Sequence, residues 1–230
     1  MQEYERLREH LARVRCRIER AAERAGRDPQ SVQIVAVTKG IEREKVQAAY
    51  ELGLRLFGEN RVQEAQRKFG ENPLPPDAEL HLIGYLQTNK VRHAVKLFAL
   101  IHSVDRAALI EELHERAARV GRRLPILIQV NIAGEEQKHG CRPAEAAELL
   151  ALGLTKPHLD VRGLMTIAPL VAESELVRPV FRALRELRDQ LQERFQHPLP
   201  ELSMGMSNDF DIAVEEGATL VRIGRALFGD

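Results

Sequence analysis

Lys39 is the residue in this sequence whose type and position most favour covalent chemistry. It follows directly after residues 32–37, Val-Gln-Ile-Val-Ala-Val, an almost continuously apolar run typical of a strand buried on both faces. A partly desolvated lysine can lose its proton and attack an aldehyde, whereas an arginine stays protonated. The ammonium group of a lysine at a strand end can also simply extend into water. Position alone therefore leaves Lys39 open to a reactive or a structural role.

Two later segments have the composition of a phosphate-binding site. Residues 203–207, Ser-Met-Gly-Met-Ser, lead into an expected short helix, and residues 222–224 read Arg-Ile-Gly. Ser207 can cap that helix, whose free backbone N–H groups favour an anion. Gly224 lets the backbone approach a phosphate closely, and Arg222 adds a fixed cation. Ordinary capping and a turn glycine would explain Ser207 and Gly224 equally well when each is taken alone.

An imine-forming lysine and a phosphate cradle together specify a phosphorylated carbonyl compound. Two ligands have that chemistry: pyridoxal 5′-phosphate, and a sugar phosphate in a Schiff-base aldolase. Cys16 and Cys141 form no Cys-x-x-Cys pair, and no His and Cys residues cluster in the sequence. We therefore expect a ligand site without a structural metal.

Apolar strand patterns and amphipathic helical patterns alternate along the chain. Leu7, Leu11, Val14 and Ile18 recur every three to four residues before Gly26 and predict an N-terminal helix. Further helices are predicted at 42–52, 61–69, 106–120, 143–152, 175–195 and 209–216. Strands are predicted at 32–37, 54–57, 80–83, 98–103, 126–131, 161–165, 201–204 and 220–223. Eight such units over residues 1–230 predict a single α/β domain, a closed (β/α)8 TIM-type barrel with an extra N-terminal helix.

The candidate residues lie at the ends of predicted strands or just after them. In barrels of this class the chemistry lies at the C-terminal ends of the strands. Lys39 follows the first predicted strand, Asn60 the second, Ser207 the seventh and Gly224 the eighth. Polar and glycine residues are common in every loop, so a single such loop is weak evidence for a ligand site. The whole set together predicts one ligand site at one end of the barrel.

The bulk composition excludes several classes of partner. Lys and Arg number 34 and so do Asp and Glu, which gives a formal net charge of zero and no broad basic field for nucleic acid. The charged, helical start differs from a signal peptide, and no apolar run is long enough to cross a bilayer. We therefore expect a soluble cytoplasmic protein that binds neither nucleic acid nor membrane.

Several motifs, in this order, resemble the YggS/PROSC family of pyridoxal phosphate homeostasis proteins. The similarity covers nearly the whole chain. It rests on Ala-Val-Thr-Lys at 36–39, Phe-Gly-Glu-Asn-Arg at 57–61, Ile-Gly-Tyr-Leu-Gln-Thr-Asn-Lys at 83–90, Ile-His-Ser-Val-Asp at 101–105, Val-Asn at 130–131, Gly-Glu at 134–135, Lys138, Gly140, Arg-Gly-Leu-Met-Thr at 162–166, Leu-Ser-Met-Gly-Met-Ser at 202–207 and Val-Arg-Ile-Gly at 221–224.

The resemblance implies a fold similar to the barrel domain of bacterial alanine racemase, with pyridoxal 5′-phosphate as cofactor. Lys39 would hold it as an internal aldimine. Ser207, Gly224 and adjoining backbone would bind the phosphate, and Arg222 would face the phosphate or the ring nitrogen. The resemblance also implies that Asn60 and Met204 lie near the pyridine ring of the cofactor.

Three positions depart from the family pattern. Tyr85 stands where the family often has histidine, and Ala133 where it often has serine. Arg225 replaces a small or hydroxylic residue after the Arg-Ile-Gly motif, which makes it a candidate phosphate contact and would shift phosphate binding toward backbone and guanidinium groups.

The resemblance implies a binding protein more than an enzyme, and no catalytic residue is assigned. An arginine beside the pyridine nitrogen would weaken the ring as an electron sink. Racemisation needs two bases, and in alanine racemase the second is a tyrosine from another domain and the partner subunit, whereas this chain ends at Asp230. We expect a monomer that holds the cofactor reversibly and passes it to pyridoxal-phosphate-dependent apo-enzymes in transient contacts. A small single-domain racemase or lyase dependent on the same cofactor is the alternative, beside the aldolase.

Overall fold

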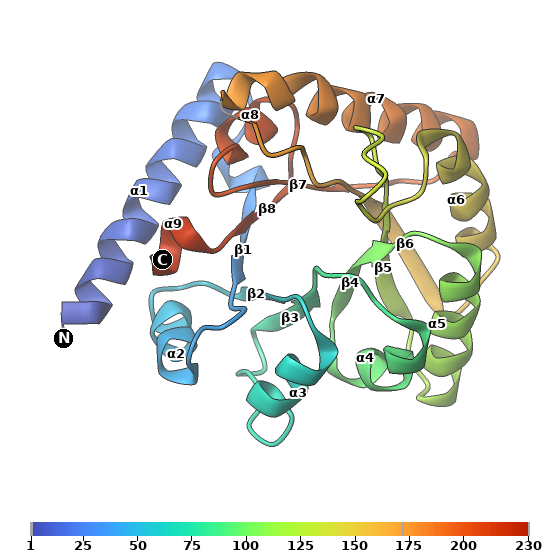
Figure 1. Ribbon diagram of the computed structural model, residues 1–230, viewed down its shortest axis with the longest axis horizontal. Coiled ribbons are helices and arrows are strands. Elements are labelled where there is room, and N and C mark those ends of the chain that lie inside the picture. Colours follow the sequence, from blue (N-terminus) through green and yellow to red (C-terminus); the bar gives the residue numbers. More distant parts are fainter. Residues whose placement is uncertain (1, 172, 230) are drawn as a thin grey trace.

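Eight parallel strands close into a barrel in the order in which they occur along the chain (Figure 1). The structure, a computed structural model, describes residues 2–171 and 173–229. The barrel closes because β8 pairs with β1, with Val35 opposite Arg222 and Ala36 opposite Ile223. The strands are β1 Gln33–Val37, β2 Leu56–Glu59, β3 Glu79–Leu82, β4 Leu100–Val104, β5 Leu124–Gln129, β6 Leu159–Met165, β7 Glu201–Met206 and β8 Leu220–Ile223. The predicted barrel is thus confirmed, with all eight predicted strands present.

Helices surround the strands on the outside of the barrel (Figure 1). They are α1 Gln2–Arg24, α2 Arg43–Glu51, α3 Val62–Phe69, α4 Val91–Leu97, α5 Ala107–Arg119, α6 Ala146–Leu154, α7 Arg178–Phe195, α8 Phe210–Glu215 and α9 Arg225–Phe228. Helices α4 and α9 were not among the predicted helices, because each spans only one or two turns and shows too little periodicity. None of these helices, in the part of the chain that is described, combines the length and apolarity needed to cross a bilayer.

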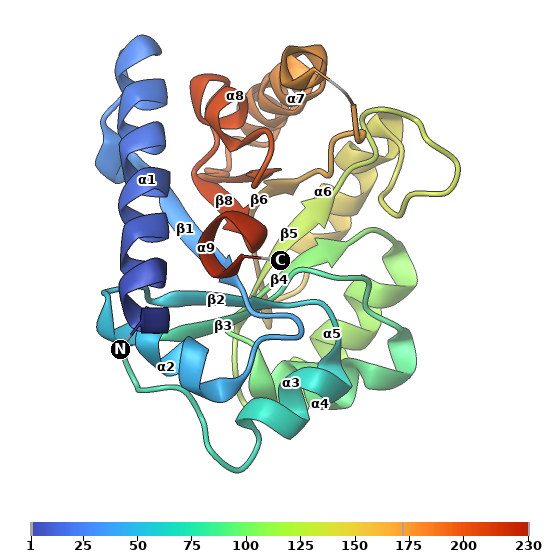
Figure 2. The ribbon, with the colours of Figure 1, turned by 60° about the vertical axis from the view of Figure 1, so that its left-hand side comes forward.

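Helix α1 is the extra N-terminal helix, and it runs beside α8 and α9 (Figure 2). Its predicted apolar stripe is buried, since Leu7, Leu11, Val14 and Ile18 are each at most 6% exposed. The helix therefore covers the side of the barrel where β8 meets β1, and it packs against α9, the last helix of the described chain.

The strand residues divide between two apolar layers because side chains alternate across a strand. One layer, between strands and helices, forms the larger core. The other fills the inside of the barrel and contains Val35, Ile83, Leu127 and Leu220 among its members. Polar side chains also face the inside of the barrel, and these carry the site.

Candidate functional site

Arg222 projects from β8 into the barrel, close to the end where the strands terminate, here called the barrel mouth. Its side chain is 4% exposed. One guanidinium nitrogen, Nη1, donates to Ser203 Oγ at 2.6 Å, and Nη2 donates to the carbonyl oxygen of Thr166 at 2.8 Å. Burial lowers the pKa of Arg222 to about 10, while the charge of Asp209 acts in the opposite direction. A cation held in this way is a fixed positive charge at neutral pH.

Ser207 lies in the loop between β7 and α8, but it caps a different helix from the one predicted. Its Oγ accepts a hydrogen bond at 3.2 Å from the backbone N–H of Ala226, in the first turn of α9. The N-cap of α8 is Asp209, whose carboxylate accepts from Met206 N at 2.6 Å. The predicted capping of α8 by Ser207 is therefore wrong, because the loop turns Ser207 toward β8 and the segment that follows it.

Ser207, Arg222 and Gly224 line one cavity of about 610 Å³ at the barrel mouth, here called the Ser207 cavity. This volume is within the range of sites that enclose small ligands. Arg225 and Met206 also line it, and Arg225 is exposed. A hydroxyl, a buried guanidinium and a glycine backbone thus converge on one space, as a phosphate site requires. The predicted grouping of these three residues is what the structure shows.

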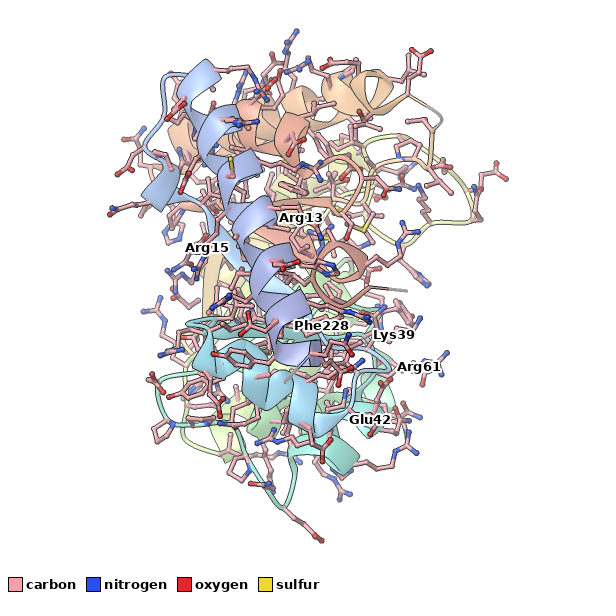
Figure 3. The ribbon with its side chains drawn as sticks, turned by 90° about the vertical axis from the view of Figure 1, so that its left-hand side faces the viewer. Arg13, Arg15, Lys39, Glu42, Arg61 and Phe228 are labelled. Atoms are coloured by element: carbon pink, nitrogen blue, oxygen red, sulfur yellow. The ribbon has the colours of Figure 1, made fainter. Side chains whose placement is uncertain are left out.

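Lys39 lines a second cavity of about 610 Å³, here called the Lys39 cavity, and its side chain is exposed. Asn60, Arg61 and Tyr85 line the same cavity, and Figure 3 shows Lys39 and Arg61 beside each other at the surface. Lys39 and the phosphate-type residues therefore share the barrel mouth but open into different cavities.

Residues that line the two cavities lie close together along the chain at the end of β1. Val37 lines the Ser207 cavity, and Lys39 follows it by two residues, a span of about 7 Å in an extended chain. A Cβ on Gly224 would lie 3.4 Å from Val37 Cβ, an ordinary van der Waals contact, so Gly224 lies against the end of β1.

Asn60 carries an unsatisfied group in the Lys39 cavity. Its Oδ1 is buried and accepts no hydrogen bond within the described part of the chain. Leaving a buried acceptor unpaired costs about 1–3 kcal/mol, so a donor from water or from a ligand is expected at this atom. The mouth thus presents a lysine for an aldehyde, and a hydroxyl, a guanidinium and a glycine backbone for a phosphate.

A cluster that the sequence analysis missed fixes the backbone around Lys39. Thr38 Oγ1 donates to Glu59 Oε1 at 2.8 Å, and Lys68 Nζ donates both to Glu59 Oε1 at 2.7 Å and to the Thr38 carbonyl at 2.6 Å. Gly40 N donates to Glu64 Oε1 at 2.7 Å. The available signal was the pair Glu59-Asn60 at the end of a strand, of which only Asn60 was singled out.

Met204 lies in surroundings that differ from the expected ones, whereas Tyr85 lines the Lys39 cavity at the barrel mouth. Met204 is fully buried in the outer core and lines neither cavity, because alternation along β7 turns Ser203 inward and Met204 outward. The methionine that lines the Ser207 cavity is Met206. Tyr85 is 42% exposed and stacks on His139, with ring centroids 4.0 Å apart.

Comparison with known proteins identifies relatives along nearly the whole chain. The family model for the alanine racemase N-terminal domain matches residues 10–230. A pyridoxal phosphate homeostasis protein of Aquifex aeolicus is 47% identical over 222 residues, covering 96% of this chain and 97% of the relative. One from Escherichia coli K12 is 40% identical over 226 residues, covering 96% and 94%. The chain belongs to the family of pyridoxal phosphate homeostasis proteins. The resemblance inferred from the sequence motifs is thus confirmed.

Solved structures place this homeostasis-family member on the racemase barrel. PipY of Synechococcus elongatus, solved with pyridoxal phosphate bound, is 40% identical with a TM-score of 0.85, covering 97% of this chain and 100% of PipY. An alanine racemase of Clostridium difficile has a TM-score of 0.77 at 15% identity, covering 98% of this chain but 57% of the racemase. The racemase likeness concerns the fold alone.

Proposed function

We propose that this chain binds pyridoxal 5′-phosphate and serves in its homeostasis, as a cytoplasmic protein that holds the cofactor reversibly and delivers it to apo-enzymes. The observation that carries the proposal is the barrel mouth, where Lys39 and Asn60 lie on one side and Ser207, Arg222 and Gly224 on the other. The family name and the ligand of PipY support the choice of cofactor over a sugar phosphate.

In this proposal each residue at the mouth has one task. Lys39 Nζ attacks the cofactor's aldehyde carbon, and one water leaves as the imine forms. Ser207 and the backbone at Gly224 bind the phosphate, and Arg222 supplies a buried positive charge. Asn60 lines the ring side. Met204, being in the outer core, would act only by supporting β7. When bound, the cofactor supplies the electrophile to which the lysine is joined.

A carrier role agrees with the surroundings of Lys39. Its side chain is exposed, and its cavity opens to solvent, so a bound ligand can leave without a large rearrangement. Tyr85 lines the cavity, but its ring is sandwiched between His139 and the guanidinium of Arg106, which lies 5.0 Å from the ring centroid. These contacts fix Tyr85 as a stacking residue in preference to a mobile base.

Absorbance spectroscopy and borohydride trapping test the covalent link. The purified protein is mixed with pyridoxal 5′-phosphate, and the visible imine band is expected to vanish on reduction. Peptide mapping should then place the adduct on Lys39. Lys39→Ala should abolish both signals, whereas Lys90→Ala, a change in the same cavity, should retain them. A colourless wild-type protein, or an adduct on Lys68, Lys90 or Lys138, would refute the assignment.

Delivery is tested separately with a trap for free cofactor. Loaded protein is mixed with a pyridoxal-phosphate-dependent apo-enzyme in the presence of a phosphatase that destroys released cofactor. Reactivation that survives the phosphatase supports direct transfer. Reactivation that disappears completely means that the protein only releases its ligand into solution. Sustained formation of D-amino acids by the loaded protein would contradict a carrier and favour the racemase.

A further inference from the structure

A continuous chain of hydrogen bonds runs through the inside of the barrel from Arg222 to Glu79. Arg222 Nη1 lies 2.6 Å from Ser203 Oγ, and Ser203 Oγ lies 2.8 Å from His102 Nδ1. His102 Nε2 lies 3.0 Å from His81 Nδ1, and His81 Nε2 lies 3.0 Å from Glu79 Oε2. The chain begins at the barrel mouth and ends at the first residue of β3, at the opposite end of the barrel.

With both histidine rings neutral, the two ends of the chain set the direction of every hydrogen bond. A guanidinium can only donate, and a carboxylate can only accept. Ser203 Oγ therefore accepts from Arg222 and directs its own proton to His102 Nδ1. His102 must then carry its proton on Nε2 and donate to His81 Nδ1, and His81 donates from Nε2 to Glu79. In this arrangement every donor in the chain has one acceptor, and each ring carries its proton on Nε2.

The middle of the chain is shielded from water. Ser203 and His102 are 0% exposed and His81 is 2% exposed. Burial, followed by the neighbouring His81 and Arg222, lowers the pKa of His102 well below its ordinary value, which agrees with a neutral ring. The insides of such barrels are usually filled by branched apolar residues. Four polar side chains in that space therefore need a reason beyond packing, because each costs desolvation energy.

That reason lies in the guanidinium of Arg222. Two of its nitrogens are held from different strands, by Ser203 of β7 and by the Thr166 carbonyl that follows β6. Ser203 Oγ accepts from Arg222, and within the described part of the chain His102 Nδ1 is the group placed to accept the proton of the Ser203 hydroxyl. A protonated His102, or one in the Nδ1–H form, would donate to Ser203 as Arg222 does and would leave the buried hydroxyl proton without this acceptor, so the hydroxyl would lose its fixed orientation. The histidines thus set the orientation of the hydroxyl that orients the guanidinium.

We propose that Ser203, His102 and His81 are positioning residues that hold the Arg222 guanidinium toward the ligand in the Ser207 cavity. This inference rests on the proposed function, because the ligand concerned is the bound pyridoxal 5′-phosphate. None of the three residues lines either mouth cavity. They act on the cofactor only through Arg222.

Paired substitutions at His102 separate positioning from packing. His102→Gln keeps an acceptor for Ser203 and a donor for His81, whereas His102→Leu fills similar space with apolar groups. If His102 only fills space, the leucine variant should retain the cofactor better than the glutamine variant. If His102 positions Ser203, the glutamine variant should retain it better. We expect His102→Leu and Ser203→Ala to raise the rate of cofactor loss roughly tenfold, the effect of one buried hydrogen bond. His102→Gln should stay within about threefold of the wild type.

Thr219→Val is the matched control for the serine substitution. Thr219 Oγ1 also bridges strand residues of β7, accepting from Leu202 N at 2.9 Å and donating to Glu201 at 2.7 Å, but it lies before β8, away from Arg222. The Thr219→Val variant should retain the cofactor as the wild type does. Cofactor loss from His102→Leu at the wild-type rate, or faster loss from His102→Gln than from His102→Leu, would overturn the inference.

A second measurement uses the protein without ligand. Histidine side-chain ¹⁵N spectra should show His102 neutral, with its proton on Nε2, from about pH 5.5 to 8, a range that spans the ordinary histidine pKa. A protonated ring or an Nδ1–H tautomer would refute the chain, even if the leucine variant failed to fold. Wild-type protein that takes up no cofactor would refute the proposed function and the ligand-directed role, while the spectra would still report on the chain itself.

Discussion

Lys68 Nζ and Glu59 Oε1 lie 2.7 Å apart in a nearly buried ion pair, whose side chains are 12% and 0% exposed. The same ammonium group binds the carbonyl of Thr38, the residue before Lys39. Burial raises the pKa of Glu59, although hydrogen bonds from Lys68 and Thr38 oppose this effect. The pair therefore ties α3 and β2 to the backbone that presents Lys39.

Lys68→Met should destabilise the protein by about 3 kcal/mol, because it leaves a buried carboxylate without its cation. The pKa of Glu59 should rise further, so the folded state would bind a proton that the unfolded state releases. Stability should then fall as pH rises above the ordinary carboxyl range. Urea unfolding at pH 5 and pH 8 measures this. Lys45→Met removes an exposed pair with Glu3 and should change stability by at most about 1 kcal/mol. Equal losses in both variants would contradict the prediction.

Gly84→Ala should impair cofactor uptake by displacing Asn60. A Cβ at residue 84 would lie 2.8 Å from Asn60 Cα, so the backbone that carries the unsatisfied Oδ1 must move. Overpacking of this kind costs about 1–3 kcal/mol. Gly121→Ala is the control, because its φ of +67° makes alanine costly by about 1–2 kcal/mol while nothing lies near its Cβ. Titration with pyridoxal 5′-phosphate should show weaker binding for the first variant only.

Glu216→Gln should weaken the protein at neutral pH but not in acid. Burial alone would raise the pKa of Glu216, but hydrogen bonds from Arg182 and Arg178 outweigh it and hold the pKa below 4.5. An acid whose pKa is lowered by folding contributes stability above its unfolded-state pKa and loses it as pH falls through the folded-state value. The loss should be about 1.5–3 kcal/mol at pH 7 and should shrink below pH 4.5. The free energy of unfolding of both proteins is measured by chemical denaturation at several pH values. A difference between the variant and the wild type that does not change with pH would contradict this account.

Cys141 should be inert toward alkylating reagents in the folded protein. Its side chain is 5% exposed, and burial is the largest cause that raises the pKa of its thiol to about 12. Thiolate is the reactive form, so almost none is present at pH 8. Cys16, in α1, is partly exposed and should react first. Mass spectrometry after iodoacetamide treatment reads out both sites, and labelling in urea shows that both thiols are intact.

Arg222→Gln should weaken cofactor retention more than Arg225→Gln does. Both arginines line the Ser207 cavity, but Arg222 is buried and fixed by two hydrogen bonds, whereas Arg225 is exposed. Removing a buried charge-assisted hydrogen bond costs about 1.5–3 kcal/mol, or roughly ten- to hundredfold in affinity. Exposed charges contribute much less. Equal retention by the wild type and the Arg222 variant, measured by dialysis, would mean that the phosphate is misplaced.

The barrel could be predicted because its signals are local. The apolar run at 32–37 became β1 Gln33–Val37, and the stripe of α1 is buried as its period indicated. Parallel strands end on the same side of a sheet, so strand order alone placed Lys39, Asn60 and Gly224 at one mouth. Ser207 was placed there too, although its hydrogen-bonding partner was not foreseen.

The amino-acid sequence by itself determined which side chains reach the barrel mouth. Strand periodicity and strand ends depend on residues that are close together in the sequence. Only the tertiary structure decided which atoms meet. Ser203 and His102 are separated by 101 positions, and Lys68 meets Glu59 from a different element. Such contacts depend on the register of the closed barrel and on which way each side chain turns. Burial then sets their charge, and burial is a property of the whole fold.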